Sequence, residues 1–207
     1  NLKFAGARID FFFDGHDNRV HMTQDEVDAN MQGILDLIEE MDVDILLAQE
    51  VDIESKRSAY LDMAQVILDE TDMNYAAWIP IWQSRYIAEE GTGPVKMGQA
   101  VFSRYPILRN TRVDLPQSST QSAIVNYFYL RRAIQITEVN LGTSGVMSVV
   151  NNHPAAYALD GTKQLHLERI HEWSVDLAAP KIVGGDLNVV PPGSVRLSDF
   201  ADQVPVE

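Results

Sequence analysis

The chain has 207 residues, of which 45% are hydrophobic and 22% are charged, so it can bury one sizeable core and is rather short for two domains. Thirty Asp and Glu residues against 16 Lys and Arg give a formal net charge of −14, which disfavours nonspecific binding to nucleic acid. The absence of cysteine excludes disulfides, zinc–thiolate sites and cysteine nucleophiles. Apolar runs fall far short of the roughly 20 residues that span a bilayer. We therefore expect one soluble domain, cytoplasmic or exported.

The first third of the chain predicts helix, strand and helix in turn. Thr23 to Glu26 has the spacing of a capping box, and apolar residues follow at helical intervals as far as Met41. The short apolar run Ile45 to Leu47 is bounded by acids, which indicates a strand covered on both faces and ending at Gln49-Glu50. An apolar stripe predicts a second helix over about residues 57–70.

Strands dominate the rest of the chain. Those expected are Tyr75 to Ile81, Gln99 to Ser103, Val125 to Val139 with a break inside, and Val146 to Asn151. Residues 83–97 have the composition of a surface loop, and apolar spacing predicts a helix from about Thr162 to Leu177. Alternating helices and strands indicate a mixed α/β (α+β) domain whose sheets are covered by helices.

Polar residues follow three of these predicted strands. Glu50 ends the first, Asn151 and His153 end another, and Asp186 and Asn188 follow the apolar residues of IVGGDLN. Ligands of α/β folds commonly bind beyond strand ends, where the rigid backbone fixes the side chains that hold them. Residues far apart in the sequence could therefore converge on one ligand.

The segment IVGGDLN is expected to be a buried strand. Two residues at positions i and i+2 of an extended segment point the same way, so Asp186 and Asn188 could act on one ligand. Gly184-Gly185 would allow a neighbouring backbone to approach closely, and Pro191-Pro192 would end the strand. The alternative is an ordinary turn, because Gly, Asp and Asn are all common turn residues.

The remaining candidates each have a functional and a structural interpretation. Glu50 is a hard oxygen donor suited to Mg²⁺ or Mn²⁺, or else a solvent-facing acid beside a strand. His153 could donate to a phosphoryl oxygen, or it could be a histidine satisfied at a strand end. Arg131 and Arg132 point to opposite faces of an extended segment, so at most one can reach a given pocket.

Four motifs resemble one known family. AQEV at 48–51, GQAVFSRYPI at 98–107, NNHPAAY at 151–157 and GGDLNVVPP at 184–192 occur in the order and approximate spacing of the endonuclease/exonuclease/phosphatase superfamily. That superfamily includes deoxyribonucleases, sphingomyelinases and inositol polyphosphate phosphatases. The resemblance implies a four-layer αββα sandwich, with two mixed sheets covered by helices, that cleaves phosphate esters with Mg²⁺ or Mn²⁺.

The resemblance also implies a role for each matching residue. By this resemblance, Glu50 and Asn1 would be metal ligands, and Arg131 and Asn151 would contact the substrate phosphate. His153 would donate a hydrogen bond in the transition state. Asp186 would orient or deprotonate the attacking water, and Asn188 would hold phosphate or metal. In-line attack on a phosphate ester places charge on the phosphoryl oxygens, which a divalent ion and His or Asn donors would stabilise.

The resemblance further implies that the family's first strand precedes Asn1 and that its closing Asp-His pair follows Glu207. We therefore expect residues 1–207 to form a single phosphoesterase domain that is incomplete at both ends. The acidic balance favours small phosphoesters, inositol phosphates or phospholipid head groups over DNA. One alternative is a non-catalytic member that binds a phosphorylated ligand or partner. Another is an unrelated α/β module, in which Glu50, His153 and Asp186 would lie far apart.

Overall fold

The computed structural model describes residues 1–11, 18–87, 91–156, 160–190 and 193. Two β-sheets form its centre. The three-stranded sheet has the order β1 (Ile45–Asp52), β3 (Val95–Ser103), β2 (Tyr75–Ser84), and both of its pairs are antiparallel. The four-stranded sheet has the order β4 (Ile107–Asp114), β5 (Ala133–Asn140), β6 (Val146–Asn152), β7 (Lys181–Gly185), and its β6–β7 pair is parallel.

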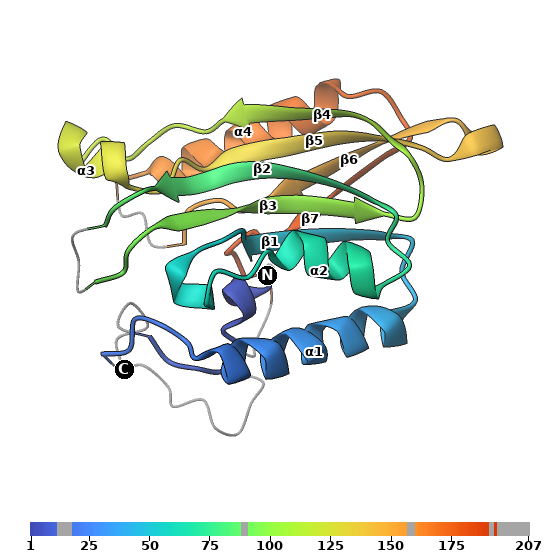
Figure 1. Ribbon diagram of the computed structural model, residues 1–207. Coiled ribbons are helices and arrows are strands. Elements are labelled where there is room, and N and C mark those ends of the chain that lie inside the picture. The colour runs from blue at the N-terminus through green and yellow to red at the C-terminus, as the bar shows by residue number, and fades with distance from the viewer. Residues whose placement is uncertain (12–17, 88–90, 157–159, 191–192, 194–207) are drawn as a thin grey trace.

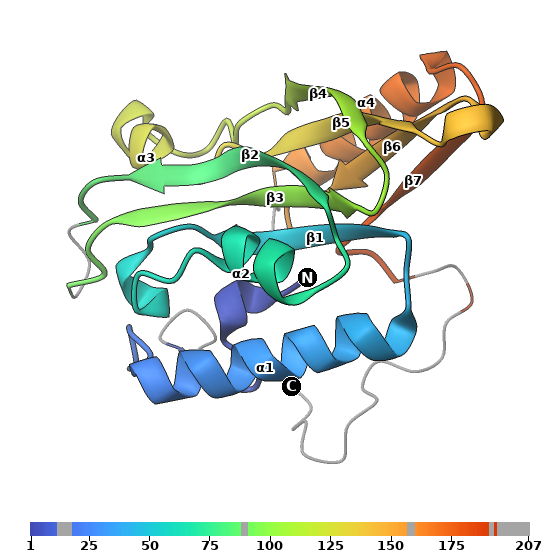
Figure 2. The same ribbon diagram turned by 45° about the vertical axis from the view of Figure 1, so that its right-hand side comes forward.

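Helices cover the outer face of each sheet (Figures 1 and 2). The helices α1 (Gln24–Met41) and α2 (Met63–Glu70) lie over the three-stranded sheet, and α4 (Thr162–Asp176) lies over the four-stranded sheet. A short helix, α3 (Ala123–Phe128), stands beside the carboxyl end of β2. No helix in the described part of the chain is long and apolar enough to cross a membrane. The predicted four-layer αββα sandwich is confirmed.

The capping box predicted at the start of α1 is present. The Thr23 side chain accepts a hydrogen bond from the Glu26 N–H, and the Glu26 carboxylate accepts one from the Thr23 N–H at 2.8 Å, so two otherwise unpaired donors of the helix terminus are satisfied. The buried residues of α1 are Val27, Met31, Leu35 and Ile38, which belong to the core beneath β1 and β3. The capping box therefore accounts for where α1 begins, and the spacing of its apolar residues accounts for which face is buried.

Buried amides join the two sheets face to face. The Gln49 side chain on β1 donates to Asn151 Oδ1 on β6 at 2.6 Å, and the Asn151 amide donates to the backbone oxygens of Ala48 and Ala100 at 3.0 Å each. Gln99 donates to the Asn151 backbone oxygen at 3.0 Å. Gln49, Gln99, and Asn151 have 0–1% of their surface exposed. Because buried amides are costly unless paired, this amide network fixes how the sheets sit on each other.

Several predicted element boundaries were wrong. The second helix begins at Met63, capped by the Asp62 side chain, and Lys56–Ser58 forms a separate 3-10 turn. Residues 83–97 are not all loop, because β2 and β3 both extend into them, and β4 was not predicted. The expected strand over 125–139 is instead α3 followed by β5.

The segment IVGG is an edge strand and not a buried one. Ile182 and Val183 are 46% and 43% exposed, and β7 pairs only with β6 among the described strands. The strand ends at Gly185, so Asp186 and Asn188 lie in the following turn and not in extended chain. The Asp186 side chain accepts a hydrogen bond from the Asn188 N–H at 3.0 Å, which is the local bond that lets Asp form turns. Pro191 and Pro192 lie outside the described residues.

Candidate active site

Four predicted site residues converge at one end of the sandwich. The Asn1 amide donates to Glu50 Oε1 at 3.2 Å and to Asp186 Oδ2 at 2.9 Å. His153 Nε2 lies 3.8 Å from Glu50 Oε1 and 3.7 Å from Asp186 Oδ2. Residues as far apart in sequence as 1 and 186 therefore share one polar cluster, which excludes the arrangement expected of an unrelated module.

A β-bulge presents Glu50 to this cluster. Gln49 pairs with Gln99 and Val51 pairs with Gly98, so Glu50 is an extra residue without a partner in the ladder. Its φ of +56° is uncommon for a residue with a side chain. The prediction that the strand ends at Glu50 was wrong, because β1 continues to Asp52. Bulges redirect side chains next to active sites, and here the bulge turns Glu50 toward Asn1 and Asp186.

A glycine brings Asp186 to the cluster. A Cβ on Gly185 would lie 2.1 Å from the Asn152 carbonyl oxygen, and the φ of Gly185 is +124°, so the position requires glycine. This supports the expected close backbone approach at Gly184-Gly185. After the turn, the Asn188 amide donates to Pro154 O at 3.1 Å. Asn188 thereby joins the β7 turn to the segment that follows His153.

Burial keeps His153 neutral. The side chain is 5% exposed, and burial, followed by the positive charge of Arg132, lowers the pKa of His153 to about 3, while the charge of Asp186 acts in the opposite direction. At neutral pH the imidazole carries one N–H and no charge. A neutral imidazole can donate one hydrogen bond to a phosphoryl oxygen.

Asp186 is held in its ionised form. Burial acts to raise the pKa of Asp186, but hydrogen bonds from the Asn1 amide and the Asn188 N–H outweigh it, so the net effect is a lowered pKa. The carboxylate therefore has a negative charge at neutral pH. That is the state in which it can orient a water or bind a cation.

The structure places Arg132, and not Arg131, beside this cluster. Arg132 donates to the backbone oxygen of His153 at 2.8 Å; burial lowers the pKa of its guanidinium, and the charges of Glu50 and Asp186 act in the opposite direction. The Arg131 side chain is exposed, with its guanidinium 6.0 Å from the Tyr127 ring. The resemblance implied Arg131 for the substrate phosphate, whereas the alternation of an extended segment indicated only that at most one of the two arginines could reach the pocket.

Asn151 lies beneath the cluster in the amide network. Its side chain is fully buried between the sheets, where it accepts from Gln49 and donates to Ala48 and Ala100. These bonds use the polar atoms of the side chain. The placement favours a role in positioning Glu50 and His153 over direct contact with phosphate.

The donor set suits a hard divalent cation. No group of three or more His, Asp or Glu side chains within the described ranges has the geometry of a complete metal cage. Mg²⁺, however, commonly uses one or two carboxylates and takes its other ligands from water and substrate phosphate. Glu50 and Asp186 supply two carboxylates, between which the Asn1 amide now places its partial positive charge. These residues fit such an ion.

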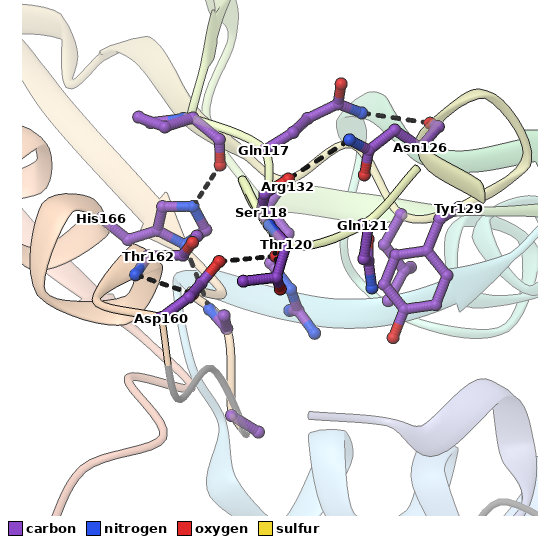
Figure 3. Close-up of a pocket in the computed structure, with 14 residues that line it drawn as sticks. Gln117, Ser118, Thr120, Gln121, Asn126, Tyr129, Arg132, Asp160, Thr162 and His166 are labelled. Carbon is purple, nitrogen blue, oxygen red and sulfur yellow. Dashed lines mark hydrogen bonds between the residues drawn. The ribbon is translucent and has the colours of Figure 1, made fainter. Parts of the chain in front are cut away.

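Figure 3 shows a cavity of about 470 Å³, and Arg132, one of its lining residues, links it to the cluster through the hydrogen bond to His153 O. It lies between the β4–β5 connection, the residues after His153 and the start of α4, and Arg132 forms part of its wall. Pockets of about 300–1,000 Å³ are typical of small-molecule sites. The described part of the chain thus combines a polar cluster with a neighbouring cavity of ligand size.

The protein is thus a sandwich of two sheets in which acid, imidazole and amide side chains gather where strands end. The sequence model of the Endonuclease/Exonuclease/phosphatase family matches residues 23–199, and the chain belongs to that family. None of the curated proteins matches the chain.

Solved structures share the fold. An endonuclease/exonuclease/phosphatase from Beutenbergia cavernae DSM 12333 superimposes with a TM-score of 0.56 at 20% identity, over 78% of this chain and 44% of that one. Sphingomyelinase C from Streptomyces griseocarneus gives 0.55 at 18% identity, over 79% and 57%. The human Nocturnin catalytic domain gives 0.54 at 20% identity, over 80% and 58%. The chain spans about half the length of these structures.

Proposed function

We propose that this chain is a phosphoesterase that uses a divalent metal ion, Mg²⁺ or Mn²⁺, and direct attack by water. The observation that carries the proposal is the convergence of Glu50 and Asp186 on His153, whose Nε2 lies within 4 Å of a carboxylate oxygen of each, together with membership of a phosphoesterase family. The expected substrates are small phosphate esters. Nucleic acid is less favoured, because the chain has a net charge of −14.

Each residue of the cluster has a proposed part in the reaction. Ionised Asp186 accepts a hydrogen bond from the attacking water and takes up its proton. Neutral His153 donates to a phosphoryl oxygen, and Arg132 adds positive charge on the same side. Glu50 and Asn1 would hold the metal ion, which when bound would lower the pKa of water and offset phosphate charge. Asn188 orients the Asp186 turn through its bond to Pro154.

The test is hydrolysis of bis(4-nitrophenyl) phosphate and 4-nitrophenyl phosphate with Mg²⁺ or Mn²⁺. We expect turnover that EDTA abolishes. The Asp186→Asn variant should keep its fold and lose activity by a factor on the order of 100 or more, because an amide cannot take up the proton. Asp176→Asn is the matched control, since Asp176 is exposed at the end of α4.

Two results would contradict the proposal. Asp186→Asn activity near that of the unsubstituted chain would remove Asp186 from the reaction. Binding of a phosphorylated compound without turnover under any metal condition would instead favour a non-catalytic, phosphate-binding member of the family.

A further inference from the structure

The cavity beside the cluster is joined to the phosphate site by a shared wall. Arg132 lines the cavity and donates to the His153 backbone oxygen, and Ala155 and Ala156 continue the chain from His153 along the same wall. A phosphate held at His153 would therefore place its ester group at the mouth of this cavity. The lining of the cavity can then be used to deduce the chemistry of that group.

Hydrogen bonds build the far wall before any ligand arrives. Asp160 accepts from Ser118 Oγ at 2.6 Å, from the Ser119 N–H at 3.1 Å and from the Thr162 N–H at 3.1 Å, which joins the β4–β5 connection to the start of α4. His166 donates to Pro116 O at 2.7 Å while accepting from the Ala155 N–H at 3.2 Å. Because these residues are already ordered, a ligand does not have to order them, and the entropic cost of binding is lower.

Uncharged polar groups remain for a ligand. Among the described residues that line the cavity, the Gln121 amide and the Tyr129 hydroxyl form no hydrogen bond with another residue drawn in Figure 3, where both lie on the side away from His166. The Gln117 amide nitrogen is used on Asn126 O, which leaves its oxygen as an acceptor. Amides and a phenol hydroxyl beside an aromatic ring face suit a ring that has hydroxyls on its edge and C–H groups on its face.

The charges of the lining limit the ligand to one phosphate. Arg132 is the only Arg or Lys among the described lining residues, and it lies at the phosphate end. Asp160 is ionised, because hydrogen bonds from Ser118 and Thr162 hold its pKa well below the usual range. Burial lowers the pKa of His166, so this side chain adds no positive charge at neutral pH. A second phosphate on the ring would find no further cation among the described lining residues and would face the Asp160 carboxylate.

We infer that the cavity binds an uncharged, hydroxylated ring, a sugar or cyclic polyol, that is joined to the scissile phosphate and carries no second phosphate. The inference rests on the proposed function only for the position of that phosphate. Gln121 and Tyr129 are its specificity-determining residues.

The kinetic test uses three 4-nitrophenyl phosphodiesters with the same leaving group. The second alcohol differs among the three: glucose joined through its 6-hydroxyl, choline, or cyclohexylmethanol, whose six-membered ring is all carbon and has no hydroxyls. We expect kcat/KM for the glucose diester to exceed both others by about 10-fold or more, since polar groups of the site stay unpaired when the ester has no hydroxyls. Equal rates, or a preference for either comparison ester, would overturn the inference.

Paired variants locate the preference. Gln121→Ala and Tyr129→Phe should each reduce the glucose-to-cyclohexylmethyl ratio of kcat/KM by about 5-fold. The matched controls are Gln32→Ala on exposed α1 and Tyr75→Phe at the opposite end of β2 from α3, which should keep the ratio of the unsubstituted chain. A ratio that neither cavity variant changes would overturn the assignment of these residues.

Binding separates this inference from the proposed function. By calorimetry with Mg²⁺, glucose 6-phosphate should bind about 10-fold more tightly than glucose 1,6-bisphosphate and cyclohexylmethyl phosphate. Equal or tighter binding of either would overturn the inference whatever the activity. The expected binding order without turnover would contradict the proposed function alone.

Vesicles with a phosphate-linked glucose headgroup, compared with the soluble diester, distinguish a membrane-borne ester from a free one. Hydrolysis of either supports the inference.

Discussion

Individual side chains in the candidate site are held in the protonation state that the proposed chemistry requires. Burial makes His153 neutral, and two hydrogen bonds keep Asp186 ionised although it is partly buried. Groups whose environments push their pKa values apart are typical of acid–base sites. For Glu50 the decisive feature is the backbone: a β-bulge with a φ in the left-handed region directs its side chain into the site.

Replacement of Glu50 by Gln tests whether that residue binds metal. An amide is a weaker ligand for Mg²⁺ than a carboxylate, so the activity of Glu50→Gln should fall by about 10-fold or more at low Mg²⁺ and recover in part at high Mg²⁺. Titration of activity against Mg²⁺ measures the shift. Glu54→Gln, an exposed acid shortly after β1, is the control and should give the unsubstituted curve. An identical loss for Glu50→Gln at every Mg²⁺ concentration would show that Glu50 is not a ligand.

At the level of elements, the amide network couples the two sheets to the site. Gln49 directly precedes Glu50 on β1, and Asn151, on β6, lies two residues before His153, which directly follows that strand. Their hydrogen bond of 2.6 Å therefore fixes the relative position of the strand segments that carry the acid and the imidazole. Rigid elements of this kind hold catalytic groups more accurately than loops.

Asn151→Leu should disrupt both packing and activity. The substitution removes the acceptor of the 2.6 Å bond from Gln49 and the donor to the buried carbonyls of Ala48 and Ala100, so we expect the free energy of unfolding to fall by about 2–4 kcal/mol and kcat to fall in the folded variant. Urea unfolding and phosphoesterase assays measure the two effects. Asn74→Leu at an exposed position should change the free energy of unfolding by less than about 0.5 kcal/mol. An Asn151 variant of unchanged stability would show that the network is dispensable.

The helix α4 contributes a pH-dependent contact through His166. Burial lowers the pKa of His166 in the folded chain, whereas the unfolded value is about 6.5, so the unfolded state binds more protons just below pH 6.5. The contribution of His166 to stability should therefore fall as the pH falls through this value, by at most about 1.4 kcal/mol between pH 6.5 and 5.5. The structural cause is that protonation of Nδ1 would displace the Ala155 N–H. This loss adds to the one from His153, whose pKa is also lowered by burial.

Urea unfolding at pH 7.5 and 5.5 measures this contribution. His166→Gln should reduce the loss of stability between the two pH values, because glutamine can bond to both partners without titrating. His171→Gln on the exposed side of the same helix should leave that loss as it is in the unsubstituted chain. Equal losses in both variants would exclude His166 as its source.

Sequence patterns correctly predicted the elements whose signals lie within a few neighbouring residues. They did not predict features that depend on contacts between residues far apart in the chain. The capping box and apolar spacing located α1, because both lie within a few turns of one helix. The strand expected over 125–139, with a break inside, is β5 in its second half, but its first half was wrong, because strand propensity does not show that residues 123–128 form a helix before β5 pairs with β4. The bulge at Glu50 depends on the register between β1 and β3, which sequence period cannot reveal.

Residue types and predicted strand ends were enough to predict the cluster of acid and imidazole side chains, but they did not predict the neighbouring arginine or the cavity. Glu50, His153 and Asp186 converge as the motifs implied, whereas the choice of Arg132 over Arg131 depends on how the chain leaves α3 and enters β5. The cavity was not predicted at all, because its wall combines the β4–β5 connection with the start of α4.

At the scale of the whole molecule, the net charge of −14 opposes the arrival of an anionic substrate. Salt screens this repulsion: the Debye length falls to about 8 Å at 0.15 M ionic strength. We therefore expect kcat/KM to rise by about 2-fold when KCl increases from about 20 to 150 mM at saturating Mg²⁺, and to rise more for a phosphomonoester than for a diester. A steep fall with salt, as in proteins that release counterions from nucleic acid, would contradict this expectation.

The bulge in β1 has a consequence for insertion and deletion. Because Glu50 is the unpaired extra residue, removal of that single position would leave Gln49 opposite Gln99 and Val51 opposite Gly98. Gln49 would still face the sheet interface and Val51 the helix-side core, so the alternation of the strand would survive. Deletion of this one codon would thus remove the proposed metal ligand while the rest of the strand keeps its alternation of interface-facing and core-facing side chains.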